Sequence, residues 1–163
     1  MFILTRFLSL LMFINVSVGK DLDKTPPKRL INGQNEELFD FPSLASLSKR
    51  RIGAWFHYCS AVLVSPTKLV TAAHCVRNKK IINVRVSLGM VNLFGPPNEF
   101  EQVLRVDKFD MHDGSYITND IAVITMATPA KLNKNVKVVV LAEKDSNYVR
   151  ENCTISGWGR ELM

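Results

Sequence analysis

Two residues of this chain lie in local contexts suited to acid–base chemistry. His74 lies in the segment Thr-Ala-Ala-His-Cys, and Asp120 lies in the segment Asn-Asp-Ile-Ala-Val. An imidazole can take up and return a proton near neutral pH. A carboxylate bonded to the ring would fix its tautomer and stabilise the imidazolium form. Such a pair could activate a hydroxyl nucleophile for hydrolysis, whereas His57 and His112 lie in no comparable context and fit surface or core positions better.

Four segments in order carry a resemblance to a known family. The histidine and aspartate segments resemble the corresponding motifs of the trypsin-like (chymotrypsin-family, S1) serine endopeptidases. Arg-Leu-Ile-Asn-Gly at residues 29–33 resembles that family's activation junction, and Ser-Gly-Trp-Gly at 156–159 resembles a segment early in its second barrel. The resemblance implies that His74 is a catalytic base and Asp120 its orienting carboxylate. Asp107, Asp110 and Asp113 lie nearby, but none of them has the Asn-Asp-Ile-Ala context.

The nucleophile of such a triad is absent from these 163 residues. In the chymotrypsin order the serine follows the aspartate by roughly ninety residues, and no Gly-Asp-Ser-Gly-Gly segment occurs anywhere in the chain. The backbone donors of an oxyanion hole and the walls of a specificity pocket would lie in the same missing region. We therefore expect a peptidase domain truncated before its serine and inactive as this chain.

The three cysteines fit an exported protein. The resemblance implies a disulfide between Cys59 and Cys75, and closing a loop of this size stabilises a fold by about 3 kcal/mol in the chain-entropy model. The family partner of Cys153 is missing, which leaves a free thiol, an intermolecular bond or an absent partner. A zinc site built from His57, Cys59, His74 and Cys75 is an alternative, but the spacing is not that of paired-cysteine zinc sites. We expect no metal and no other cofactor.

The N-terminus is typical of a secretory leader. Arg6 precedes an apolar run that is too short for a comfortable membrane span, and small residues precede a possible cut after Gly19. We expect a signal peptide at 1–19, a propeptide at 20–29 and activation by cleavage between Arg29 and Leu30. An uncleaved anchor is the alternative. The mature chain would be secreted and extracellular, as a zymogen, with no membrane contact after removal of the signal.

Removing residues 1–29 takes away five basic and two acidic side chains and so halves the formal net charge of +6. The remaining charge is too small to indicate a nucleic-acid partner. Basic clusters at 49–51 and 77–80 fit solvated loops best, and a role in binding an anionic surface is a less favoured reading.

Short β-branched and aliphatic runs separated by proline and glycine predict an all-β fold. We expect the first six-stranded antiparallel barrel of a trypsin-like double barrel, with only the start of the second, in a domain at 30–163. The predicted strands are 60–64, 69–71, 82–88, 101–106, 121–125 and 136–140, and the one helical turn lies near 72–76.

Two hypotheses follow. The chain is either part of a secreted trypsin-like serine endopeptidase acting on proteins or peptides, and open to protease inhibitors, or a non-catalytic secreted homologue that holds a protein partner or inhibitor. The presence of both His74 and Asp120 favours the first hypothesis.

Overall fold

The computed structural model describes residues 40–112, 119–143, 149 and 151–158. The expected signal peptide, propeptide and cleavage site at Arg29 and Leu30 lie outside these residues. Within the described part of the chain, no helix has the length and apolar character needed to cross a membrane.

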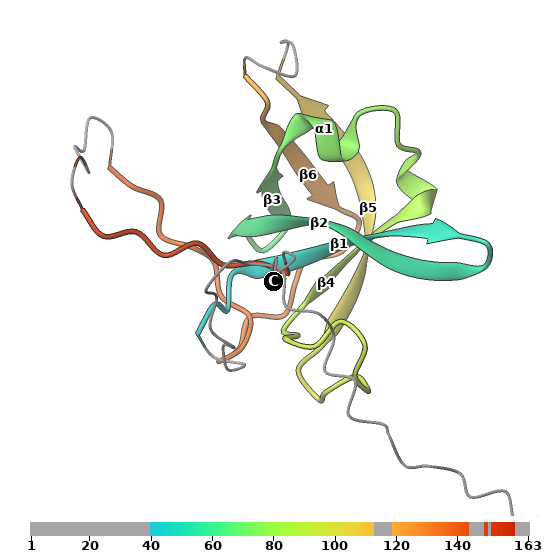
Figure 1. Ribbon diagram of the computed structural model, residues 1–163, viewed down its shortest axis with the longest axis horizontal. Helices are drawn as coiled ribbons and strands as arrows, with labels where there is room; N and C mark the ends of the chain where they lie inside the picture. Colours follow the sequence, from blue (N-terminus) through green and yellow to red (C-terminus); the bar gives the residue numbers. More distant parts are fainter. Residues whose placement is uncertain (1–39, 113–118, 144–148, 150, 159–163) are drawn as a thin grey trace, which may run out of the picture.

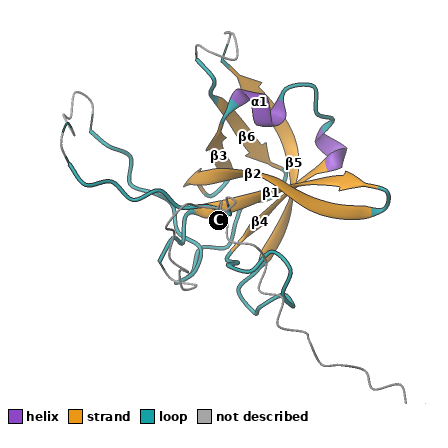
Figure 2. Ribbon diagram, viewed as in Figure 1, coloured by secondary structure: helices purple, strands orange, loops and turns teal. Residues whose placement is uncertain are grey.

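Six strands close into one antiparallel barrel in the order β1-β2-β3-β6-β5-β4 (Figure 1). The strands are β1 (Leu44–Arg51), β2 (Ala54–Ser65), β3 (Lys68–Thr71), β4 (Val84–Leu88), β5 (Gln102–Met111) and β6 (Ala122–Met126). Two short helical turns complete the described secondary structure, α1 (Ala73–Val76) and the 3-10 turn η1 (Ile81–Asn83) (Figure 2). The prediction of an all-β, six-stranded antiparallel barrel is confirmed.

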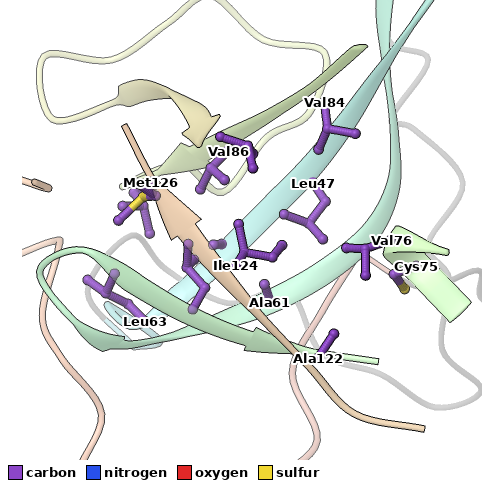
Figure 3. Packing of buried hydrophobic residues seen from close by; sticks show 14 of the residues in the cluster. Leu47, Ala61, Leu63, Cys75, Val76, Val84, Val86, Ala122, Ile124 and Met126 are labelled. Carbon is purple, nitrogen blue, oxygen red and sulfur yellow. The ribbon is translucent and has the colours of Figure 1, made fainter. Parts of the chain in front are cut away.

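Alternation along the strands builds the core. In β4, Val84, Val86 and Leu88 point inward and are at most 2% exposed, as a strand with one buried face requires. Leucine and isoleucine side chains from the other strands meet them inside the barrel, and Val76 of α1 packs at one end (Figure 3). The core is therefore made almost entirely by the barrel and the turn that follows β3.

The β1–β2 connection is a two-residue turn at Ile52 and Gly53. Both residues have positive φ, at 46° and 78°, which is the conformation that lets a two-residue turn follow the twist of its strands. Glycine adopts it freely, whereas a β-branched residue does so at a cost. The hairpin tip extends well away from the barrel (Figure 1).

Several predictions about strands need correction. β2 (Ala54–Ser65) and β5 (Gln102–Met111) are much longer than the predicted strands 60–64 and 101–106. β1 was not expected, because its serines and basic residues hide the alternation; Ser46 and Ser48 are nonetheless buried against neighbouring strands. Residues 82–83 belong to the 3-10 turn rather than to β4. Residues 136–140 form no strand despite their valines, since they have no neighbouring ladder and contact the barrel through isolated bonds such as Val139 N–H to the Leu63 carbonyl.

The described residues after β6 first pack against the barrel, where Ala130 and Val136 join the buried core, and then lead away from it. Lys137 N–H donates to the Pro42 carbonyl at 2.9 Å. At the far end, the Trp158 indole N–H donates to the Val91 carbonyl at 2.5 Å. Hydrogen bonds and buried side chains thus attach residues 127–139 to the barrel, and the described residues beyond them are more extended (Figure 1).

Candidate active site

The pairing of β3 with β6 brings His74 and Asp120 together. Thr71 is the partner of Ala122 in this antiparallel pair. The chain leaves β3 at Thr71 and enters β6 at Ala122. The end of β3 and the start of β6 therefore lie at the same edge of the barrel, next to each other. His74 follows in α1, and Asp120 lies two residues before the start of β6. Two residues far apart in sequence thus become neighbours through strand pairing.

Local backbone structure on each side completes their placement. Asn119 has a φ of 58°, a left-handed conformation that asparagine tolerates better than most residues. Its carbonyl accepts the Ile121 N–H at 2.8 Å, which closes a tight turn around Asp120. On the other side, the Thr71 hydroxyl donates to the Ser60 carbonyl at 2.8 Å and fixes the start of the helical turn.

Asp120 binds His74 with both carboxylate oxygens. Its Oδ1 accepts the backbone N–H of His74 at 2.8 Å, and its Oδ2 lies 2.6 Å from the ring Nδ1. One contact positions the backbone and the other orients the ring. With Nδ1–H donating a hydrogen bond to the carboxylate, the free lone pair of the imidazole lies on Nε2.

These hydrogen bonds also set the charge of the site. The bond from the His74 ring, followed by that from its backbone N–H, holds the pKa of the Asp120 carboxyl below its ordinary value of 3.8. Asp120 therefore remains a carboxylate at neutral pH. The His74 side chain is 54% exposed and that of Asp120 27%, so the ring is open to a further partner.

A disulfide anchors the turn that carries His74. Cys59 of β2 and Cys75 of α1 are bonded, with Cα atoms 6.1 Å apart. The Cys75 Sγ lies 3.5 Å from the His74 Nε2. The ligand atoms of Cys59, His74 and Cys75 all lie within 4.8 Å of one another. Both sulfurs are consumed in the disulfide, so this cluster offers no thiolate to a zinc ion.

His57 does not join the cluster of Cys59, His74 and Cys75, although the alternative zinc site would require it there. Its Nδ1 lies 2.8 Å from the Ser46 hydroxyl, and its ring meets Trp158 edge-on at 5.4 Å between centroids. Sequence reasoning missed this pair, since nothing in the sequence near Ser46 distinguishes it from a surface serine. The backbone N–H of His112 donates to the Ile121 carbonyl at the entry to β6.

The site contains an acid–base pair and, among the described residues, no nucleophile in contact with it. The His74 ring bonds Asp120 and lies near Cys75, and no described serine hydroxyl bonds to either ring nitrogen. Free Cys153 is exposed. The arrangement can accept a proton at Nε2 and stabilise the resulting cation. It thus contains the base and the orienting group that nucleophilic catalysis needs, but not the nucleophile.

Comparison with known proteins agrees with this arrangement. The Trypsin family model matches residues 30–162. Fibrinolytic enzyme isozyme C of Lumbricus rubellus is 36% identical over 138 residues, which are 80% of this chain and 55% of that protein. Chymotrypsin-C of Mus musculus is 31% identical over 136 residues, 81% of this chain and 50% of that protein. Chymotrypsin-like elastase family member 1 of Rattus norvegicus is 32% identical over 138 residues, which are 81% of this chain and 51% of that protein.

The chain spans about half the length of the curated relatives it matches. The matched part includes the barrel, α1 and the segment after β6. Because the family match extends over most of the sequence, this protein belongs to the trypsin family of serine endopeptidases.

Proposed function

We propose that this chain supplies the histidine–aspartate part of a catalytic triad for peptide-bond hydrolysis, with His74 as the general base and Asp120 as the orienting carboxylate. The observation that carries the proposal is the double contact of one carboxylate with the backbone and the ring of a single half-exposed histidine. A merely structural histidine of a barrel would have no need of an exposed ring held in one tautomer.

The mechanism follows from the two ring nitrogens. Nδ1–H donates to Asp120 Oδ2, so Nε2 accepts the proton of a serine hydroxyl as its oxygen attacks the scissile carbonyl. The protonated ring then returns this proton to the departing amine, and the acyl group stays on the serine until water removes it by the same steps. Asp120 stays ionised throughout and stabilises the imidazolium.

The serine and the oxyanion donors have to come from residues outside this sequence. Residues 1–163 contain no Gly-Asp-Ser-Gly-Gly segment, so we propose that the chain alone hydrolyses no peptide bond. Loss of the nucleophile alone removes about six orders of magnitude in kcat. Substrates of the complete site would be proteins or peptides, and inhibitors of such proteases would be further partners.

Export and activation are part of the same proposal. The apolar N-terminal run and the small residues before Lys20 support secretion to the extracellular space. The sequence Arg-Leu-Ile-Asn-Gly supports activation by cleavage between Arg29 and Leu30. The Cys59–Cys75 disulfide is consistent with an oxidising compartment.

Two measurements test the proposal. The purified chain should give no labelling with a fluorophosphonate probe, and labelling of any of its serines would contradict its inactivity. Long-read transcript sequencing across the Met163 codon should reveal a product that continues through a serine-containing segment. In that product, Asp120→Asn should lower kcat by about 10⁴-fold, since an amide favours the wrong tautomer.

Asp107→Asn is the matched control, because Asp107 is an exposed aspartate of β5 outside the site. It should leave kcat unchanged. If no transcript or genomic sequence encodes a nucleophile segment, the proposal fails and a non-catalytic binding role takes its place.

A further inference from the structure

The disulfide beside the candidate base brings three side chains with metal-binding atoms together. The ligand atoms of Cys59, His74 and Cys75 all lie within 4.8 Å of one another. Cys59 belongs to β2 and the other two residues belong to α1, so the barrel and the turn after β3 hold them in place. In the oxidised chain the two sulfurs are bonded to each other, and neither can bind a cation as a thiolate. Opening that bond adds two soft ligands to the histidine.

The chemistry of this opening balances with a thiol as the reductant. Two molecules of a small thiol such as glutathione supply two electrons and two protons, and they leave joined as one small-molecule disulfide. Cys59 and Cys75 each become a thiol. Zn²⁺ then displaces the two thiol protons and forms two zinc–sulfur bonds. The balance needs no reactant other than the thiol and the metal.

The distance between the histidine and one sulfur already suits a tetrahedral metal. Zinc–sulfur bonds of about 2.3 Å and zinc–nitrogen bonds of about 2.0–2.1 Å place the sulfur and nitrogen ligand atoms about 3.6 Å apart. The Cys75 Sγ lies 3.5 Å from the His74 Nε2. Two thiolates on one zinc lie about 3.8 Å apart, so the sulfurs must separate by roughly 1.7 Å from bonding distance. That movement is smaller than the shift of a sulfur between two χ1 rotamers.

Asp120 supports the histidine from the other side of the ring. The His74 Nδ1 lies 2.6 Å from Asp120 Oδ2, and Oδ1 of the same carboxylate accepts the His74 backbone N–H. Metal-binding histidines commonly donate their second ring N–H to a carboxylate, which fixes the tautomer and makes the metal-facing nitrogen more basic. The free lone pair therefore lies on Nε2, the nitrogen that approaches Cys75.

The exposure of the cluster leaves room for a fourth ligand. Cys75 is 5% exposed, whereas the His74 side chain is 54% exposed. One side of the cluster thus rests on the barrel, and the other faces water. Three protein ligands with one open position are typical of zinc sites that keep a water molecule. Two thiolates and an imidazole favour Zn²⁺ over Mg²⁺ and Ca²⁺, because those two cations prefer oxygen ligands.

We propose that reduction of the Cys59–Cys75 disulfide converts this cluster into a Zn²⁺ site. The ligands are the two sulfurs and the His74 Nε2, and Asp120 orients the ring. The metal replaces a covalent link between β2 and α1 with a link through zinc between the same elements. It also occupies the lone pair that a general base needs. Zinc binding does not itself depend on the proposed catalytic role of His74, so the experiments below measure binding alone.

Cobalt titration of the full chain tests this proposal. Bound Co²⁺ reports thiolate ligands by charge-transfer absorption and tetrahedral geometry by its visible bands. A phosphine reduces the disulfide without adding a competing thiol. The reduced chain should bind one Co²⁺ with both absorptions, and Zn²⁺ should displace it. The oxidised chain should show neither absorption, and equally tight binding by the oxidised chain would overturn the proposal.

Two pairs of variants identify the ligands. Cys75→Ala should weaken cobalt binding by at least about a hundredfold, since a thiolate ligand is lost. Cys153→Ala is its matched control, because it removes an exposed thiol outside the cluster. His74→Ala should remove the tetrahedral bands, whereas His112→Ala, which removes an exposed histidine elsewhere, should keep them. Equal effects within either pair would contradict the ligand assignment.

Asp120→Asn distinguishes a folded site from the thiols of an unfolded chain. The variant keeps all three ligands but loses the carboxylate that orients His74, so cobalt affinity should fall by about 10- to 100-fold. Asp107→Asn is the control and should leave affinity within about twofold, because Asp107 is an exposed aspartate of β5. Cysteines of an unfolded chain would bind cobalt equally well in both variants. Unchanged affinity in Asp120→Asn would therefore overturn the proposal.

Melting temperatures give a second, independent measurement. A ligand that binds the folded state and not the unfolded state stabilises the folded state. Zn²⁺ should therefore raise the melting temperature of the reduced chain and leave that of the oxidised chain unchanged. No increase for the reduced chain, or an equal increase for both, would show that the cluster is not the site.

Discussion

The barrel and the described residues from Val140 onward use the same residue types in opposite ways. Val86 and Leu63 in the barrel are completely buried, whereas Val140 and Leu141 are 92% and 67% exposed. Cys75 is in a disulfide, whereas Cys153 is free and exposed. The strands supply a closed set of partners to every inward side chain. The later segment, which follows β6, buries Ala130 and Val136 against the barrel and then leaves it, so that Val140 and Leu141 have few partners. Partners, not residue type, decide which valines belong to a core.

The candidate site lies entirely on the barrel side of this comparison. His74 and Asp120 are positioned by the β3–β6 pair, and their turn is anchored by the disulfide to β2. A rigid scaffold of this kind holds catalytic groups in place at little entropic cost. The segment at 127–158 contributes one aromatic contact to His57 and none to His74 among the described residues.

The largest expected contrast is between two leucines. Leu63→Ala removes a fully buried side chain of β2 and should lower the free energy of unfolding by about 2–5 kcal/mol. Leu141→Ala removes an exposed side chain and should change it by no more than about 0.5 kcal/mol. Urea unfolding followed by fluorescence measures both. A comparable loss for Leu141→Ala would show that Leu141 has a packed partner.

The cysteines give the next contrast. Replacing Cys59 and Cys75 together by alanine opens a loop with a sequence separation of 16 and should lower the free energy of unfolding by about 3 kcal/mol. Cys153→Ala should leave it unchanged, because that thiol is exposed and forms no disulfide within the described structure. Denaturant titrations under non-reducing conditions compare the two. If Cys153→Ala also lowered the free energy of unfolding, Cys153 would have a stabilising role and the contrast between the two sets of cysteines would fail.

Sequence patterns predicted those parts of the fold that depend on local alternation or on a distinctive motif. The alternation in Val84–Leu88 indicated β4 because one face of that strand is buried. The motif around Cys75 pointed to the bond that the structure contains. The roles of His74 and Asp120 as base and orienting group remain predictions, although the two side chains are in contact.

Features that depend on distant partners could not be read from the sequence. β1 reads as polar, yet Ser46 is fully buried because it pairs between β2 and β4 and bonds His57. The valine run at 136–140 reads as a strand, yet no neighbouring strand is there to complete a ladder. Both errors have the same origin: strand formation needs a paired neighbour, which a local pattern does not specify.

A smaller effect is expected at Trp158, where the two regions touch. Trp158→Phe keeps an aromatic ring beside His57 but removes the N–H that donates to the Val91 carbonyl. One neutral hydrogen bond contributes about 1 kcal/mol. The loss should loosen the later segment rather than the barrel. Amide hydrogen exchange should therefore quicken near Lys137 and leave β4 unchanged; faster exchange throughout β4 would show that the two regions form one cooperative unit.

The smallest effect expected is on stability in acid. The pKa of Asp120 is lower in the folded protein than its ordinary value of 3.8, chiefly because the His74 ring bonds the carboxylate. The contribution of the ionised Asp120 to stability is complete above the pKa that this carboxyl has in the unfolded chain. It is lost as the pH falls through the lower pKa of the folded protein. The pair is solvent-accessible, so the change should be small. Melting temperatures of the unchanged chain and Asp120→Asn should therefore differ above about pH 4 and converge below it.

Asp107→Asn, on the exposed face of β5, should show no such convergence. If the difference in melting temperature between Asp120→Asn and the unchanged chain were the same at all pH values, the variant would have lost packing rather than charge. The charge of Asp120 would then contribute nothing to holding His74.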